Sequence, residues 1–197
     1  MRALAALPLL LLLACQADSS PVPGPVAPEV AAEKITISLT VGDATLSATR
    51  TSKTHWRLED GEGEKVGKIS VEPDRVKVKD AAGQLRAKVK LRKAGLKLED
   101  GAGAQLVRLK MRGGERFDLE LESGEVVGTV DGRSGTLRGV RVEAEPIENG
   151  FAVKTSAEPI SVRGPVLGGA AVAASYPGLD IYQRLALLVF VYAVRPG

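Results

Sequence analysis

A glycine recurs at nearly constant spacing through much of the chain, and this period constrains the fold more than any other feature. The five glycines lie 21, 20, 20 and 21 residues apart, at Gly42, Gly63, Gly83, Gly103 and Gly124. Apolar side chains stand seven and five residues before each glycine, and another stands six residues after it. A period of this length indicates that one supersecondary unit is repeated along the chain.

Each repeat has the pattern of a β-hairpin. In VKVKDAAGQLRAKVKL, residues 76–91, apolar and basic side chains alternate on both sides of a DAAG turn. Alternation with a period of two is typical of a half-buried strand, and Asp80 and Gly83 are residues that turns favour. LKLEDGAGAQLVRLKM, residues 96–111, repeats the pattern with Asp100 and Gly103. The basic side chains are predicted to face outward and the aliphatic ones inward.

Five such hairpins supply ten strands, and a further hairpin around Asn149 and Gly150 brings the expected number to about twelve. An antiparallel meander exposes its edges unless it closes into a ring. The predicted fold is therefore all-β dominated (β+α), an antiparallel meander that closes into a barrel. A solenoid is the alternative use of such a period, but solenoids usually need capping units and leave the C-terminal segment without a role.

Ten consecutive apolar residues, LALLVFVYAV at 185–194, stand near the C-terminus. As a helix they would span about 15 Å, half the hydrocarbon core of a bilayer, so a transmembrane anchor is disfavoured. A helix that is apolar all round is instead a buried one, and a barrel of about twelve strands is too wide for its own side chains to fill. A helix at about 180–195, capped by Asp180, is predicted to plug the barrel. Residues 168–174 form either a short extra helix or a packing layer.

The N-terminus, MRALAALPLLLLLACQADSS, has the features of a secretory leader. Arg2 precedes an apolar run that ends at Cys15, the only cysteine of the chain. The tetrapeptide that ends at Cys15, Leu-Leu-Ala-Cys, resembles the lipobox of bacterial lipoproteins, although a small residue usually stands where this chain has Leu13. Lipidation of Cys15 is therefore predicted, and an ordinary signal peptide with an incidental cysteine is the alternative.

These features divide the chain into three parts. Residues 1–14 form the signal peptide, residues 15–34 the lipidated cysteine with a proline-rich tether, and residues 35–197 the barrel domain. Four prolines within residues 21–28 favour polyproline II over a packed core. By resemblance to Gram-negative sorting, Gln16 after the cysteine indicates the outer membrane. The expected location is the bacterial outer membrane, lipid-anchored on the periplasmic side, with surface exposure left open.

The D-x-x-G turns and the apolar C-terminus together resemble a known superfamily. LEDGEG, VKDAAG and LEDGAG, with the terminal LALLVFVYAV, are similar to the tubby-like superfamily, which includes tubby C-terminal domains, phospholipid scramblases and LURP-one-related proteins. The resemblance spans about residues 35–195 and implies a barrel of twelve strands closed around a hydrophobic C-terminal helix. Tubby domains bind phosphoinositides through basic residues on the barrel wall, but no motif of this chain matches theirs residue by residue.

Residues for catalysis or metal binding are scarce in the sequence. His55 is the only histidine, and the only cysteine is the predicted lipidation site, so neither a Ser/His/Asp nor a Cys/His arrangement is expected. Asp60, Asp80 and Asp100 occupy separate turns and are interpreted as turn formers, with a calcium site on one rim as the less favoured alternative. The sequence predicts a protein that is not an enzyme and has no cofactor or metal.

Basic residues are concentrated between residues 65 and 116. This stretch carries 15 Lys and Arg against six Asp and Glu. The simpler interpretation is a solvated strand face whose lysines discourage edge pairing. The more specific interpretation is that the basic side chains form a binding surface for anionic lipid head groups. Each positive charge near a membrane surface contributes about 1 kcal/mol to such binding. The candidate lipid-binding residues are Lys77, Lys79, Lys88, Lys90, Arg92, Arg108, Lys110 and Arg112.

Two functions are compatible with these features. The first is a membrane-anchored, non-catalytic envelope lipoprotein that binds anionic phospholipid through the basic barrel wall. The second is a structural or partner-binding envelope module with no lipid ligand. The expected partners are the membrane, through lipidated Cys15, and either anionic phospholipid or envelope proteins. Nucleic acid is not expected, because aromatic residues make up 4% of the chain and stacking platforms need them.

Overall fold

The computed structural model describes residues 34–194, except 114–115 and 156–157. The predicted signal peptide, the lipidation site Cys15 and all but the last residue of the tether lie outside the described residues. Residues 195–197 also lie outside them.

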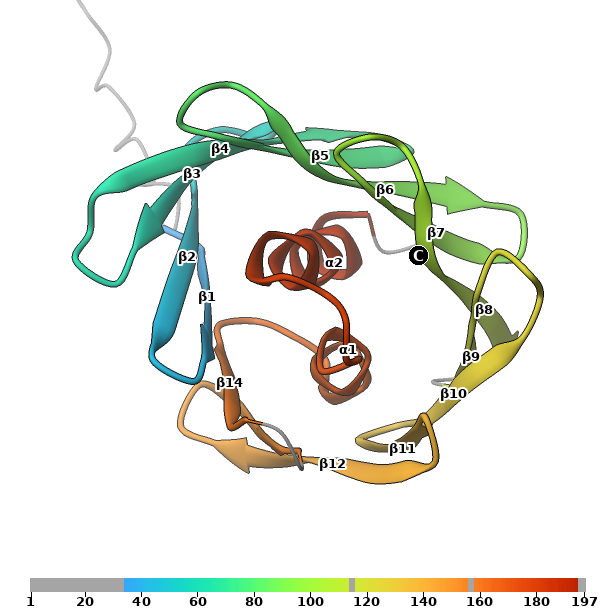
Figure 1. The fold of residues 1–197 in the computed structure, drawn as a ribbon. Helices are drawn as coiled ribbons and strands as arrows, with labels where there is room; N and C mark the ends of the chain where they lie inside the picture. Colours follow the sequence, from blue (N-terminus) through green and yellow to red (C-terminus); the bar gives the residue numbers. More distant parts are fainter. Residues whose placement is uncertain (1–33, 114–115, 156–157, 195–197) are drawn as a thin grey trace, which may run out of the picture. The chain divides into compact units, whose positions relative to one another are not determined.

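Fourteen antiparallel strands form one closed sheet within the described residues (Figure 1). Each strand pairs with its neighbours in the sequence, and β1 (Thr36–Val41) pairs with β14 (Ile160–Arg163) to complete the ring. The other strands are β2 (Ala44–Arg50), β3 (His55–Asp60), β4 (Lys65–Glu72), β5 (Arg75–Asp80), β6 (Leu85–Arg92), β7 (Gly95–Asp100), β8 (Gln105–Gly113), β9 (Arg116–Glu120), β10 (Val126–Asp131), β11 (Ser134–Leu137), β12 (Val140–Ile147) and β13 (Gly150–Lys154). The predicted closed antiparallel barrel is confirmed.

The number of strands differs from the prediction. The described residues contain fourteen strands, whereas the hairpin patterns indicated about twelve, and the two that the patterns missed are β11 and β14. Each is four residues long, SGTL and ISVR, which is too short for an alternating pattern to be recognised. β14 bonds both β13 and β1 and therefore closes the ring. The closure was predicted, but the strand that makes it was not.

The D-x-x-G repeat forms a tight turn followed by a β-bulge. In three hairpins an aspartate carboxylate accepts a hydrogen bond from the backbone N–H four residues on, at 2.8–2.9 Å: Asp60 from Glu64, Asp80 from Gln84 and Asp100 from Ala104. The glycine of each turn has a φ of 80–93°, which glycine adopts without a Cβ penalty. The strand register shifts just outside each turn, and such bulges bend and twist a strand, which helps a sheet to close. The three aspartates are turn formers, as predicted.

Two helices occupy the inside of the ring, α1 (Gly168–Ala174) and α2 (Ile181–Ala193) (Figure 1). α2 begins with a capping box, in which Asp180 accepts a hydrogen bond from the Gln183 backbone and the Gln183 side chain accepts one from the Asp180 backbone. Every residue from Gln183 to Phe190 is buried, so the C-terminal helix is a buried one, as predicted. Among the described residues, no helix is long and apolar enough to cross a membrane.

The two helices share the interior of the barrel between them. α2 packs against β1, β2 and β4 to β7, and α1 packs against β10 to β13. Trp56 of β3 meets Tyr192 of α2 edge to face, with ring centroids 5.8 Å apart. All seven residues of α1 are buried, and a Cβ on Gly169 would come within 2.8 Å of the Gly132 carbonyl oxygen. Residues 168–174 are therefore both a short helix and a small-residue packing layer.

Candidate functional site

Four adjacent strands, β5 to β8, carry eleven cationic side chains, and we group seven of them as one outer surface. We call this surface the basic face, and its residues are Arg75, Lys77, Lys79, Lys88, Lys90, Lys97 and Arg108. They point outward because the valine and leucine residues between them are buried in the core. Five of the seven were predicted from the sequence, whereas Arg75 and Lys97 were not.

The strand register aligns four of these cations in one row across the sheet. Arg75 is opposite Lys90, Lys90 is opposite Lys97, and Lys97 is opposite Arg108. A glutamate stands at each end of this basic row, Glu72 beside Arg75 and Glu120 beside Arg108. Because like charges directly opposite one another destabilise a sheet, the basic row has a cost that an ordinary solvated strand face avoids.

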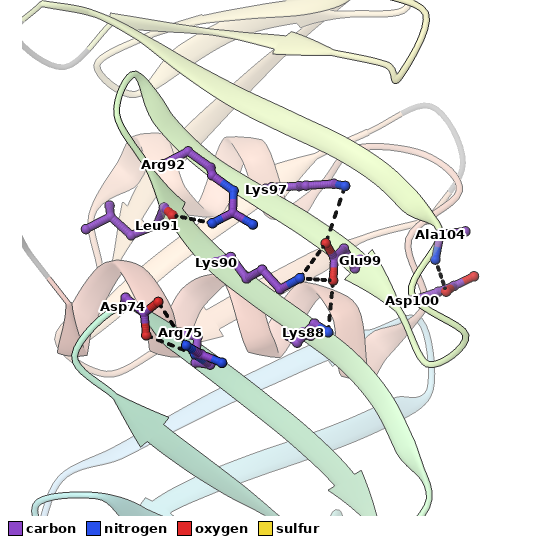
Figure 2. Close-up of polar contacts among 10 residues, drawn as sticks. All are labelled: Asp74, Arg75, Lys88, Lys90, Leu91, Arg92, Lys97, Glu99, Asp100 and Ala104. Carbon is purple, nitrogen blue, oxygen red and sulfur yellow. Dashed lines mark hydrogen bonds and ion pairs between the residues drawn. The ribbon is translucent and has the colours of Figure 1, made fainter.

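A buried carboxylate, Glu99 on β7, lies at the centre of the basic face (Figure 2). Its oxygens lie 2.9 Å from Lys90 Nζ, 3.1 Å from Lys88 Nζ and 3.3 Å from Lys97 Nζ. The Glu99 side chain is 4% exposed, whereas the three lysines keep 21–25% of their side-chain surface in solvent. One negative charge is shared among three ammonium groups, so the cluster keeps a surplus of positive charge that reaches solvent.

The same contacts fix the ionisation of Glu99. Burial by itself raises the pKa of this carboxyl group, but hydrogen bonds from Lys90, Lys88 and Lys97 outweigh burial and lower the pKa from 4.5 to about 2. Glu99 is therefore ionised across the whole physiological range. The cluster is a permanent arrangement of one anion and three cations rather than a group that titrates near neutral pH.

The remaining predicted residues differ in how far carboxylates neutralise them. Lys77 pairs with Glu72 at 2.7 Å, Lys110 pairs with Glu120 at 3.1 Å, and Arg112 pairs with Asp118. Lys79, Arg92 and Arg108 form no ion pair with any residue that the structure describes.

Arg108 is the cation of the basic row with spare hydrogen-bonding capacity. Its Nε is buried and has no hydrogen-bond partner in the described part of the chain. A guanidinium group prefers planar or tetrahedral oxygen anions that can accept two hydrogen bonds. Arg108, together with the neighbouring Lys97, is therefore the part of the basic row best suited to hold a phosphate or carboxylate.

Arg92 and Arg112 lie at the ends of β6 and β8, outside the basic row. Two large apolar side chains are exposed at the same place, Leu91 at 37% and Met111 at 49%. Leu91, Arg92, Lys93 and Met111 border one shallow surface hollow, which we call the β6–β8 rim. Exposed apolar side chains beside basic ones are typical of a surface that meets a membrane interface.

His55, the only histidine of the sequence, stands at the start of β3 among hydroxyl side chains. His55 is exposed, and its Nδ1 lies 2.9 Å from the Thr54 hydroxyl and 3.4 Å from the Ser52 hydroxyl, both in the loop just before β3. In the part of the chain that the structure describes, no three His, Cys, Asp or Glu side chains come together as metal ligands.

Glu99, Arg75 and Lys97 are the site residues that the sequence reading missed. Glu99 stands at the end of LKLED beside a turn aspartate, where it has no obvious role. One signal could have found it: residues 93 and 94 form a two-residue loop, which fixes Lys90 opposite Lys97 and Lys88 opposite Glu99. Predicting the register of this hairpin would have placed Glu99 among the lysines.

The comparisons with known proteins leave the family open. No family model and no curated protein matches the chain. The chain is similar to a protein from Arabidopsis thaliana whose X-ray structure is solved, at 14% identity and a TM-score of 0.37, over 72% of this chain and 86% of that one. A likeness this distant carries no functional argument, and the resemblance to the tubby-like superfamily stays a prediction.

Proposed function

We propose that the barrel is the head-group-binding domain of a lipid-anchored envelope protein, and that it binds anionic phospholipid through the basic face without catalysis. The observation that carries the proposal is the basic row, in which four cations stand in register across β5 to β8. One carboxylate is shared among three lysines of this face. A bound phosphate would relieve the repulsion among the cations that Glu99 leaves uncompensated.

Lys97 and Arg108 are the residues expected to hold the phosphate. They are directly opposite each other, and the buried Nε of Arg108 has no partner among the described residues. Arginine donates two parallel hydrogen bonds to an oxyanion, and lysine adds a compact charge. Lys90 lies on the other side of Lys97 and supplies a third cation.

The β6–β8 rim supports a membrane surface over a free phosphate as the source of the anion. Leu91 and Met111 are exposed apolar side chains next to Arg92 and Lys93. At a bilayer, the apolar side chains would enter the interface while the basic ones stay at the level of the head groups. A soluble phosphate ligand would leave Leu91 and Met111 without a role.

The lipid anchor is part of the same proposal. Lipidation of Cys15 and a place on the periplasmic side of the bacterial outer membrane are predictions from the sequence. An anchored barrel meets head groups at a high effective concentration, so individually weak contacts suffice. Mass spectrometry of the mature N-terminus tests the anchor: acylated Cys15 as the first residue is expected, and an unmodified N-terminus elsewhere would contradict it.

Vesicle flotation of residues 16–197 tests the basic face without the anchor. All strands of the closed sheet and both helices lie within 34–194, so this chain retains the whole barrel. The vesicles contain phosphatidylcholine with or without phosphatidylglycerol, at low and moderate salt. Binding to the anionic vesicles alone is expected, and it should weaken as salt rises because exposed charges are screened.

A charge-matched pair of variants separates the basic face from net charge. Replacing Lys97 and Arg108 with glutamine removes two charges from the basic row, and the expected loss is about 30-fold at about 1 kcal/mol per charge. Replacing Arg141 and Arg163 with glutamine removes the same net charge from exposed positions on β12 and β14, outside the basic face. Equal losses in both variants would refute the site. A folded wild type that ignores every vesicle would favour the structural or partner-binding module, to be followed by cross-linking.

A further inference from the structure

A cavity of about 240 Å³ lies where the barrel closes, away from the basic face. It is bordered by β11, β12, β14 and the loop between the two helices. Its walls are largely aliphatic, from Leu137, Val140, Val142, Ile160 and Pro177. A concave, mostly apolar site with a few converging polar groups is the usual form of a small-molecule site.

Arg184 of α2 lines this cavity and is only 6% exposed. Its Nε donates a hydrogen bond to the Leu179 carbonyl oxygen at 2.8 Å. Its Nη1 is buried and has no hydrogen-bond partner among the described residues. Leaving a buried charged donor unsatisfied is costly, and a group of this kind calls for an explanation such as a bound water, ion or ligand.

A second guanidinium group borders the same cavity. Arg138 stands in the turn between β11 and β12 with a left-handed φ of 48°. Its Nε donates a hydrogen bond to the Tyr176 hydroxyl at 3.1 Å, and its guanidinium lies 5.5 Å from the centre of the Tyr176 ring. Tyr176 is buried, so these two contacts hold the Arg138 cation in place without a carboxylate.

The acidic residues near Arg184 compensate its charge only at a distance. Burial lowers the pKa of Arg184, and the charges of Glu158 and Asp180 act in the opposite direction. The Asp180 carboxylate caps α2. Glu158 also lines the cavity, but its Oε2 lies beside the β1–β2 turn, 3.3 Å from where a Cβ on Gly42 would stand. Neither carboxylate forms an ion pair with Arg184 in the described part of the chain, so Nη1 is available to a ligand.

We propose that this cavity binds a small aliphatic monocarboxylate. The carboxylate accepts a hydrogen bond from Arg184 Nη1, with Arg138 as the second cation, because guanidinium and carboxylate groups match in geometry and charge. The alkyl chain packs against the aliphatic wall of the cavity. The volume is somewhat below the 300–1,000 Å³ of typical small-molecule sites, which favours a short chain.

Calorimetric titration of residues 16–197 with sodium octanoate tests the site. Saturable binding of one octanoate per barrel is expected, with an increase in Tm of about 5–11 °C when octanoate exceeds its Kd a hundredfold. Acetate carries the charge without the chain, and 1-octanol carries the chain without the charge. Both should bind at least tenfold more weakly than octanoate. No binding of octanoate, or equal binding of octanol, would overturn the proposal.

Two variants assign the binding to the arginines. Arg184→Met should weaken octanoate binding at least tenfold while leaving Tm close to that of the wild type, because removing a buried charge that has no ion-pair partner offsets the loss of its hydrogen bond to Leu179. A purely structural Arg184 would instead lower Tm. Arg138→Asn keeps a residue that tolerates the left-handed turn and should also weaken binding, whereas Arg141→Gln, on exposed β12 surface, should not. Unchanged affinity in Arg184→Met would refute the site. Vesicle binding should be the same in all three, so this proposal and the basic face fail independently.

Discussion

Replacing Glu99 with glutamine tests the electrostatics of the basic face directly. The substitution keeps the size of the side chain and removes the one negative charge that Lys88, Lys90 and Lys97 share. The three ammonium groups are then left close together without a counter-charge, in a place where the carboxylate was almost completely buried. Glu99→Gln should therefore destabilise the barrel.

The magnitude follows from the pKa of Glu99. Lowering the pKa from 4.5 to about 2 corresponds to about 3 kcal/mol of stability at neutral pH. The lysines are partly exposed, so solvent screening reduces this to about 2–3 kcal/mol. For a domain of this size the expected decrease in Tm is about 4–12 °C.

The pH dependence of the effect has a defined sign. The pKa of Glu99 is lower in the folded state, so its stabilisation is complete above about pH 4.5 and is lost as the pH falls towards 2. The difference in unfolding free energy between wild type and Glu99→Gln should be constant from pH 7 to 5 and shrink below pH 4.5. Urea unfolding measures it through Trp56, the only tryptophan, which is 2% exposed and contacts α2.

Glu72→Gln is the matched control. Glu72 also contacts two cations of the basic face, Lys77 at 2.7 Å and Arg75 at 3.1 Å, but its side chain is 40% exposed. An exposed pair contributes about 0–1 kcal/mol, so this variant should remain close to the wild type. A Glu99→Gln protein within 0.5 kcal/mol of the wild type, or a difference that persists undiminished at pH 2, would refute the reasoning.

Three further outcomes are expected. Glu99→Gln should bind anionic vesicles about fivefold more tightly than the wild type although it is less stable, since it adds one net positive charge to the basic face; flotation measures this, and weaker binding would contradict it. Asp100→Ala should cost about 1 kcal/mol in urea unfolding through loss of its bond to the Ala104 backbone, whereas a loss of bound metal would contradict the turn role. Gly150→Ala should sharply lower Tm, because the new Cβ would stand 1.9 Å from the Val162 carbonyl oxygen of the closing strand; an unchanged Tm would show that β13 and β14 pair differently.

The fold was largely predictable because the inward positions of the repeat carry the signal. Apolar residues at fixed offsets from each glycine become the buried core, as Leu58, Val78 and Leu98 show. The buried C-terminal helix followed from the width of such a barrel. The short strands β11 and β14 lie outside the repeat and are too short to show a period. The number of strands predicted from the sequence is therefore two lower than the number in the structure.

The candidate sites depend on contacts between segments that are distant in the sequence. The sequence showed a concentration of basic residues, but the basic row requires the register of four strands. In the sequence, Arg184 is only a polar residue directly before the apolar run that begins at Leu185. Its cavity is formed with Arg138 of the β11–β12 turn and Ile160 of β14, and no local pattern predicts that these segments meet.

The hairpins of the repeat offer an internal test of whether the cations of the basic face serve only to keep the outer surface of the strands solvated. The outer positions of the first hairpin carry hydroxyls that bond across the strands at 2.8–3.1 Å: Thr36 with Thr49, Ser38 with Ser47 and Thr40 with Thr45. Corresponding outer positions carry cations in β5 to β8, and acidic residues such as Asp118 and Asp131 in β9 and β10.

The same barrel template therefore accepts three different outer surfaces over one apolar interior. A hydroxyl ladder solvates the wall and bonds its strands without placing like charges opposite one another. The cations of the basic row are thus not required by the fold. Glu99 beside Lys90 and Lys97, and Glu72 and Asp74 beside Arg75, offset only part of the repulsion among them. Under the proposed function a bound anion would offset this repulsion, which is why binding and stability are expected to change in opposite directions when Glu99 is replaced.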